Sequence, residues 1–181
     1  MPYDPPPELA VLSLAEIAGL VEARKRPPLA QWSPAATGDS EMRIAADGRW
    51  FHRDGEITRP AMIRAFSTLL TCDESGQHWL LTPQQKLALE VEDAAFIAVD
   101  LAVQNAALVF RLNTDEFVIA GPEHRLHATG DPDTPALYLD VRHGTRARLN
   151  RSTYGQLAEI ALEGGNLTVA SQGEIFSVIP R

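Results

Sequence analysis

The chain has 181 residues, 45% of them hydrophobic, and carries 16 Lys and Arg against 24 Asp and Glu, a net charge of −8. This length is compatible with one domain or with two compact lobes, and the negative charge argues against general binding to nucleic acid or to an anionic membrane. The sequence has no run of about 18 apolar residues that could span a membrane and no secretion signal, so we expect a cytoplasmic protein.

The N-terminal segment predicts one helix. Residues 1–12 are rich in proline, which favours an extended or disordered segment. Ser13 and Glu16 then have the spacing of a capping box, and apolar residues follow at helical intervals. We therefore expect a helix over 14–25 that ends before an extended connector over 27–34.

The segment 38–60 contains two Asp-Gly pairs, which are strong signals for tight turns. If the first pair, Asp47-Gly48, forms a two-residue hairpin turn, Ile44 lies opposite Phe51. Residues that lie opposite each other point to the same side of a sheet. With this register the inward face consists of Met42, Ile44 and Phe51, and the outward face consists of Arg43, Trp50 and His52.

A second helix is predicted over 60–71. Thr58 is the expected N-cap, and Pro60 is tolerated in the first helical turn. The apolar stripe of this helix comprises Met62, Ile63, Phe66, Leu69 and Leu70. Cys72 ends the helix, and we interpret it as a buried structural thiol.

The rest of the chain alternates short strand-like runs with turns. Strands are predicted over 78–81, 86–92, 96–103, 108–113, 117–120, 137–141 and 146–149, with a loop over 131–135. A helix begins at Arg151-Ser152 and ends at Gly164-Gly165. A final hairpin joins strands over 167–169 and 175–178.

One combination of elements occurs twice. A hairpin, an X-Gly turn, a strand, an arginine at a helix start and a helix follow one another over 49–71 and again over 137–163. Hairpin-helix units are common, so the pattern alone leaves duplication and chance recurrence both open. The order of elements predicts an α+β fold.

The usual catalytic and cofactor motifs are missing from the sequence. It contains no phosphate-binding glycine loop, nucleotide-binding glycine fingerprint or nucleophile elbow. His124 and His127 would face opposite sides of a strand, which disfavours a metal site. Glu90 and Glu92 would share one strand face, as a solvated edge or as partners of arginines. We predict neither a metal nor a cofactor.

The expected outward face of Arg43, Trp50 and His52 is the best candidate for a binding site. Arginine and histidine can hold an anionic oxygen, and tryptophan can stack on a flat ring. The alternative is structural: Trp50 packs against a helix, and Arg43 pairs with Asp39 or Glu92. Arg59 and Arg111 are further charges that need partners.

Many of these residues also resemble one known family. They are Gly38-Asp39, Met42-Arg43-Ile44, Asp47-Gly48, Trp50-Phe51-His52, Gly55, Ile57, Arg59, Phe66, Thr82-Pro83, Lys86, Val91-Glu92-Asp93, Phe96, Asn113 and His124. The sequence is similar over about residues 30–180 to an uncharacterised bacterial domain-of-unknown-function family. It departs from the family pattern at Ala95 and at Ser40-Glu41.

The resemblance implies a core of two small lobes built by duplication of an antiparallel hairpin-plus-helix motif. It also implies a pleckstrin-homology-like C-terminal lobe, a groove between the lobes for a nucleotide-like ligand and a role in signal transduction. No enzymatic activity is carried over from the family. We therefore expect an N-terminal extension over 1–30, an N-terminal lobe over 31–93 and a C-terminal lobe over 94–181.

The resulting hypothesis is a non-catalytic ligand-binding or regulatory module that senses a nucleotide-like or phosphorylated small molecule. Its predicted contacts are Arg43, Trp50, His52, Arg59, Lys86, Glu92 and Arg111. One alternative is a protein–protein interaction module or a subunit of a homo-oligomer, with exposed strands as the contact surface. A less favoured alternative is an enzyme acting on a phosphorylated small molecule, with His52 as acid or base.

Overall fold

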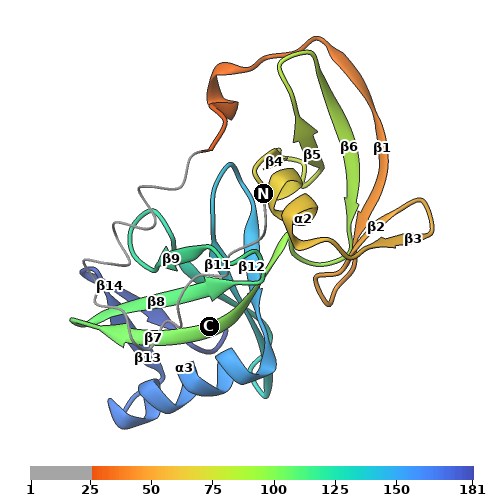
Figure 1. Ribbon diagram of the computed structural model, residues 1–181. Coiled ribbons are helices and arrows are strands. Elements are labelled where there is room, and N and C mark those ends of the chain that lie inside the picture. The colour runs from red at the N-terminus through yellow and green to blue at the C-terminus, as the bar shows by residue number, and fades with distance from the viewer. Residues whose placement is uncertain (1–25) are drawn as a thin grey trace. The chain divides into compact units, whose positions relative to one another are not determined.

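The computed structural model describes residues 26–181, which form two compact units (Figure 1). Unit 1 contains residues 26–95 together with 142–145, and unit 2 contains residues 96–141 and 146–181. The helix predicted over 14–25 lies outside the described residues.

Unit 1 is built on a six-stranded sheet with the strand order β3-β2-β1-β6-β5-β4. The strands are β1 (Ala36–Ile44), β2 (Trp50–His52), β3 (Gly55–Ile57), β4 (Leu70–Cys72), β5 (His78–Leu81) and β6 (Gln85–Val91). A 3-10 turn, η2 (Leu29–Gln31), precedes β1, and the helix α2 (Pro60–Ser67) connects β3 to β4.

Unit 2 contains a second six-stranded sheet with the order β10-β11-β12-β7-β8-β9. Its strands are β7 (Phe96–Gln104), β8 (Ala107–Leu112), β9 (Phe117–Ile119), β10 (Leu126–Asp131), β11 (Thr134–Asp140) and β12 (Arg146–Leu149). The helix α3 (Arg151–Glu163) and the hairpin of β13 (Thr168–Ser171) and β14 (Glu174–Ser177) complete the unit.

The two sheets have the same topology. Each consists of two three-stranded antiparallel meanders, and in each the first strand pairs in parallel with the sixth, β1 with β6 and β7 with β12. The α+β fold and the duplicated two-lobed core are thus confirmed. The two segments matched in the sequence, 49–71 and 137–163, are not equivalent, because the first contains strands two and three and the second strands five and six. The likeness of the C-terminal lobe to a pleckstrin-homology domain stays a prediction.

The register of the β1–β2 hairpin differs from the predicted one by one residue. The backbone N–H of Ala45 donates to the carbonyl of Arg49 over 2.8 Å, so the connecting loop has three residues and ends at Gly48, which has a φ of 89°. Ile44 therefore lies opposite Trp50, and Arg43 lies opposite Phe51. A slip of one residue moves every side chain of a strand to the other face.

The predicted faces of β1 are confirmed, since Ile44 is buried and Arg43 lies on the outward face with Phe51, but the predicted faces of β2 were wrong. Trp50 points inward, is 0% exposed, and stacks on Phe66 of α2 with 6.3 Å between the ring centroids. Phe51 takes the outward place, and the guanidinium of Arg43 lies 4.4 Å from the centre of its ring. The second Asp-Gly pair also does not form the turn by itself: His52 pairs with Gly55, so the turn consists of Arg53 and Asp54.

Both described helices were predicted, but α2 is shorter than expected. It has Arg59 rather than Thr58 as its N-cap and ends at Ser67, and Leu70 and Cys72 belong to β4 instead. The predicted helix was too long because the apolar residues continue into β4, which also contributes to the core. The predicted loop over 131–135 is in fact the tight turn between β11 and the unpredicted strand β10.

The helix α3 follows the prediction closely. It begins after Asn150, whose side chain accepts a 2.8 Å hydrogen bond from the backbone N–H of Thr153, and Gly164 caps its end. Leu157 and Ala161 are buried. None of the helices within residues 26–181 is long and apolar enough to cross a membrane, and the cytoplasmic location remains a prediction.

The segment 142–145 links β11 to β12 and belongs to unit 1. The carbonyl of His143 accepts a 2.9 Å hydrogen bond from the N–H of Cys72, and the guanidinium of Arg142 donates to the carbonyl of Ser67. Gly144 has a φ of 78°, and a Cβ at this position would overlap the carbonyl of Cys72. The segment therefore requires glycine for both its backbone conformation and its packing.

Candidate functional site

The candidate site begins at an irregularity in β1. Asp39 pairs with Ala88 of β6, whereas the next paired residue, Arg43, lies opposite Glu90, so three residues of β1 face one residue of β6. The hydroxyl of Ser40 closes this bulge by donating to the carbonyl of Ala88 over 2.8 Å and accepting from the N–H of Met42. Bulges bend a strand and re-aim its side chains.

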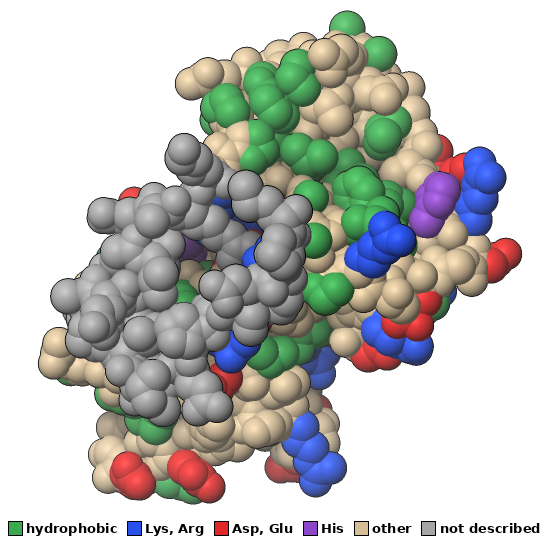
Figure 2. Space-filling view, in the orientation of Figure 1, with side chains coloured by type: hydrophobic (Ala, Val, Ile, Leu, Met, Phe, Trp, Pro, Cys, Tyr) green, Lys and Arg blue, Asp and Glu red, His purple; other side chains and the backbone are tan. Residues whose placement is uncertain are grey.

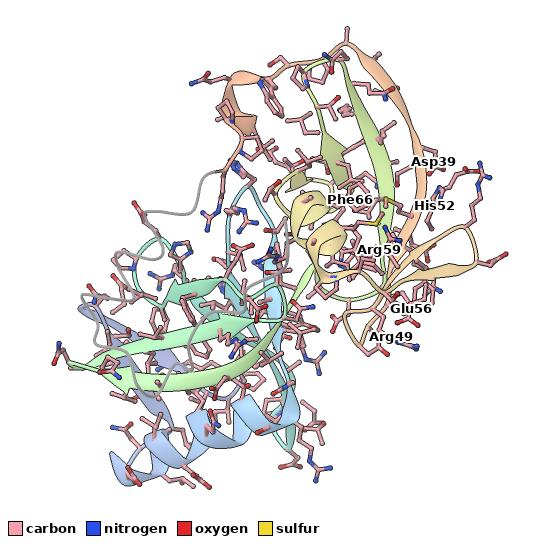
Figure 3. The ribbon with its side chains drawn as sticks, viewed as in Figure 1. Asp39, Arg49, His52, Glu56, Arg59 and Phe66 are labelled. Carbon is pink, nitrogen blue, oxygen red and sulfur yellow. The ribbon has the colours of Figure 1, made fainter. Side chains whose placement is uncertain are left out.

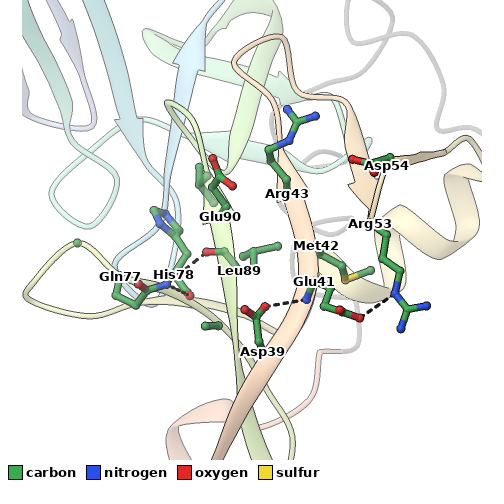
Figure 4. Close-up of a pocket in the computed structure, with 13 residues that line it drawn as sticks. Asp39, Glu41, Met42, Arg43, Arg53, Asp54, Gln77, His78, Leu89 and Glu90 are labelled. Carbon is green, nitrogen blue, oxygen red and sulfur yellow. Dashed lines mark hydrogen bonds and ion pairs between the residues drawn. The ribbon is translucent and has the colours of Figure 1, made fainter.

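A cavity of about 610 Å³ lies at the bulge (Figure 4). Its walls come from the bulge, the β2–β3 turn, the turn that leads into β5 and the second half of β6. The lining residues are Asp39, Glu41, Met42, Arg43, Arg53, Asp54, Gly76, Gln77, His78, Ala88, Leu89, Glu90 and Val91. The volume is in the range of small-molecule sites, which is about 300–1,000 Å³.

Both arginines of the lining are already in ion pairs. Arg43 donates to Glu92 over 2.6 Å, and the second oxygen of Glu92 accepts from the N–H of Ala46 over 2.8 Å. Arg53 donates to Glu41 over 2.8 Å. On the face shown in Figure 2, acidic and basic side chains of unit 1 also lie next to one another.

Three carboxylates of the lining, Asp39, Asp54 and Glu90, have no ion pair among the described residues. Asp39 accepts a 2.8 Å hydrogen bond from the backbone N–H of Glu41, which leaves its second oxygen without a bond of this kind. Asp54 and Glu90 are exposed. The cavity therefore offers hydrogen-bond acceptors that carry uncompensated negative charge.

His78 is the only histidine among the described residues that line the cavity. Its partial burial lowers its pKa from 6.5, against the opposing effects of a hydrogen bond with the Gly76 backbone and of the charge of Asp73. The imidazole is thus neutral at neutral pH and can both donate and accept a hydrogen bond.

Asp73 organises the turn that carries this part of the wall. One of its oxygens accepts from the N–H and hydroxyl of Ser75 and from the N–H of Gln77, and the other accepts from Nε1 of Trp79 over 3.0 Å. Hydrogen bonds to the charged form, above all from Ser75 and Trp79, lower the pKa of Asp73 to about 2. The turn is therefore held by an ionised carboxylate across the physiological pH range.

Few of the predicted contacts come together at this cavity. Of the seven, Arg43 lines the cavity and Glu92 pairs with it. His52, at the end of β2, and Arg59, before α2, are exposed and do not line it (Figure 3). Their role in binding stays a prediction.

The other three predicted contacts also lie elsewhere. Trp50 is buried in the core of unit 1. Lys86 lies over the ring of Trp79, with Nζ 4.3 Å from its centre. Arg111 pairs with Asp115 in unit 2 over 2.7 Å. The structural alternative for Trp50 and Arg43, packing on a helix and pairing with Glu92, is confirmed.

Reasoning from the sequence missed most of the cavity. Asp39, Glu41, Asp54, Gln77 and His78 were not proposed as contacts, although Asp39 had been considered as a partner of Arg43. The available signal was the polar run over 38–41, which interrupts the alternation expected of a strand. A run of this kind is typical of loops as well as bulges, so it does not locate a site by itself.

Comparisons with known proteins identify the family. Residues 27–94 match the N-terminal domain, and residues 95–178 the C-terminal domain, of DUF1285, which is described as a protein and domain of unknown function. The chain has no match among curated proteins.

Two solved structures are similar. A DUF1285 family protein from Silicibacter pomeroyi DSS-3 shares 31% identity with a TM-score of 0.75, over 92% of this chain and 94% of that one. A DUF1285 family protein from Shewanella baltica OS155 shares 22% identity with a TM-score of 0.54, over 65% of this chain and 90% of that one, and its likeness supports the fold alone. The chain belongs to the DUF1285 family and matches both of its domains.

Proposed function

We propose that this protein is a non-catalytic ligand-binding module and that its ligand is a small polar molecule bound in the cavity of unit 1. The observation that carries the proposal is the cavity of about 610 Å³ at the bulge of β1, which is lined mainly by polar and charged side chains. Its size fits a small molecule, and its polar groups would fix the orientation of that molecule.

The composition of the lining favours binding over catalysis. The lining residues that the structure describes include no serine, threonine, cysteine, lysine or tyrosine that could act as a nucleophile. His78 could exchange a proton, and a carboxylate can also act as a nucleophile, but among the described residues no lining carboxylate is hydrogen-bonded to His78. Occupancy of the cavity, rather than turnover, would then be the output, as in the regulatory role in signal transduction that the family resemblance implies.

A ligand screen followed by mapping tests this proposal. The full chain is screened by thermal shift against nucleotides, phosphorylated metabolites, amino acids and amines, since a ligand that binds only the folded state raises its stability. Hits are mapped by chemical-shift changes of backbone amides, which we expect at 39–43, 53–54, 76–78 and 88–91. The absence of any hit at millimolar concentration, or shifts confined to unit 2, would contradict the proposal.

Two substitutions separate the cavity from the face predicted from the sequence. His52→Ala and Arg59→Ala alter exposed residues that do not line the cavity, so they should leave the affinity unchanged within about twofold. A loss of tenfold or more in either variant would instead place the ligand at the face predicted from the sequence.

Unit 2 supports a second candidate function, a protein–protein interaction module or homo-oligomer subunit. Of the six large hydrophobic side chains recorded as exposed within the described residues, five lie in unit 2. They are Val99, Val103, Leu162, Leu167 and Ile175. Light scattering of the wild type, Leu162→Glu and Ile175→Glu tests this candidate, because a charge in a contact surface should dissociate an oligomer. A wild type that is monomeric and captures no partner contradicts it.

A further inference from the structure

The charge of the cavity wall indicates what kind of ligand it would accept. Among residues 26–181, four carboxylates line the cavity, from Asp39, Glu41, Asp54 and Glu90, against two guanidinium groups, from Arg43 and Arg53. The wall thus carries an excess of negative charge, and a ligand that supplies positive charge is favoured electrostatically.

The two arginines add little positive potential for an incoming ligand. The guanidinium of Arg43 is neutralised by Glu92, which lies outside the lining, and that of Arg53 by Glu41. An anionic ligand would have to displace these carboxylates from their arginines and would then lie near Asp39 and Glu90. A cationic ligand needs no such exchange, because Asp39, Asp54 and Glu90 have no cationic partner among the described residues.

A metal ion fits the wall less well than an organic cation. Within residues 26–181, no three His, Cys, Asp or Glu side chains gather closely enough to hold a metal ion. Carboxylates spread around a cavity of this size suit a longer molecule whose N–H groups reach them separately. Ammonium and guanidinium groups form charge-assisted hydrogen bonds with carboxylates at about 2.7–2.9 Å.

We propose that the cavity of unit 1 binds a small organic cation, with ammonium or guanidinium groups held by Asp39, Asp54 and Glu90. This inference rests on the proposed ligand-binding function and replaces the nucleotide-like ligand expected from the sequence. The neutral amide of Gln77 and the imidazole of His78 would accept or donate the remaining hydrogen bonds.

The direct test is calorimetric titration of the full chain with spermidine and with agmatine, with AMP and inorganic phosphate as anionic probes. Asp39→Asn and Glu90→Gln remove the charge while keeping the shape, and each should weaken amine binding by about tenfold or more. Glu123→Gln, an exposed residue of unit 2, removes the same charge from the molecule and should leave amine binding unchanged.

Arg53→Gln gives a second test with opposite signs for the two kinds of ligand. Arg53 is 71% exposed, and its loss frees Glu41 within the cavity wall. We expect tighter binding of spermidine and agmatine in this variant. If the cavity binds anions instead, the same variant should bind AMP or phosphate more weakly.

The outcomes separate this inference from the proposed function. Amine binding that Asp39→Asn and Glu90→Gln reduce and Arg53→Gln increases supports both. If AMP or phosphate binds with chemical-shift changes at the cavity and neither amine binds, the proposal of a cationic ligand is wrong, but the cavity is still a ligand site. If all the variants bind the amines equally well, the binding is non-specific, and the proposal of a cationic ligand in the cavity is also wrong. If neither the amines nor any other ligand of the screen binds at the cavity, both proposals fail.

Discussion

Trp50 and Phe51 are neighbours in sequence, and the structure assigns them opposite environments. Trp50 is fully buried against Phe66, whereas Phe51 lies on the outer face of the sheet, where the guanidinium of Arg43 covers its ring. The consequence is a large difference in what each ring contributes to stability, because a buried aromatic ring leaves a cavity when it is removed.

Trp50→Ala should therefore lower the free energy of unfolding by about 3–5 kcal/mol, and Phe51→Ala by about 1 kcal/mol. Urea denaturation of the full chain, followed by circular dichroism, measures both. The register expected from the sequence predicts the reverse order, so a larger loss in Phe51→Ala would show that the hairpin has that register.

His78 makes the stability of unit 1 depend on pH. Burial lowers its pKa in the folded state below the unfolded value of about 6.5. The unfolded chain then binds the proton more readily, so this contribution to stability is fully present above pH 6.5 and is lost as the pH falls below it.

His78→Gln should accordingly reduce the loss of stability between pH 8 and pH 5, measured as the shift of the urea midpoint. A reduced loss rather than none is expected, since burial also lowers the pKa of His143. His52→Gln, at an exposed position, is the matched control. An unchanged pH profile in His78→Gln would contradict the assignment.

At the scale of elements, α3 shows where local sequence is sufficient to predict structure. Asn150 caps its start, and Gly155 lies within it at a position where a Cβ would meet no atom within 4 Å. Asn150→Ala should lower the free energy of unfolding by about 1 kcal/mol. Gly155→Ala should raise it by about 0.5–1 kcal/mol, since alanine is the better helix former. Thermal unfolding of both variants checks the opposite signs, and two changes of the same sign would contradict them.

The β1–β2 hairpin shows where local sequence is insufficient. Asp47-Gly48 correctly indicates a turn, but a loop of two residues and a loop of three residues with a left-handed glycine are both compatible with it. The choice depends on which side of the strand finds a core, and that core includes Phe66 from α2. The faces of β2, and with them the roles of Trp50 and Phe51, therefore could not be obtained from the hairpin alone.

The cavity was less predictable than the fold for the same reason. The strands and helices produce periodic patterns, and most of them were found. The bulge interrupts the regular alternation of β1, because Ser40, Glu41 and Met42 together lie opposite a single residue of β6. Nothing in β1 itself specifies that partner, because β6 is distant in the sequence and pairs with β1 in parallel.

For the whole molecule, the segment 142–145 means that unit 1 is not continuous in the sequence. Gly144→Ala should displace this segment, because the added Cβ would overlap the carbonyl of Cys72. Gly130→Ala is the matched control, since Gly130 also has a positive φ but only ordinary contacts around the new Cβ.

Both substitutions should lower the free energy of unfolding by about 1–2 kcal/mol, the backbone cost of an alanine in the left-handed conformation. The loss in Gly144→Ala should be larger than this. Hydrogen exchange of the full chain should show the Cys72 amide losing protection only in Gly144→Ala, because its acceptor is the carbonyl of His143. Equal protection of this amide in the two variants would contradict the role of the segment.

The parallel pairing of first and last strands in each sheet has a consequence for how the chain folds. Neither sheet can be completed until its sixth strand is available, so the closing contact joins residues that are far apart in sequence. Loops of this length must close before the closing pair forms, and proteins rich in such non-local pairings fold in about milliseconds to seconds. During synthesis the first sheet cannot be completed before β6 has left the ribosome. Unit 1 as a whole cannot be completed before residues 142–145 have done so.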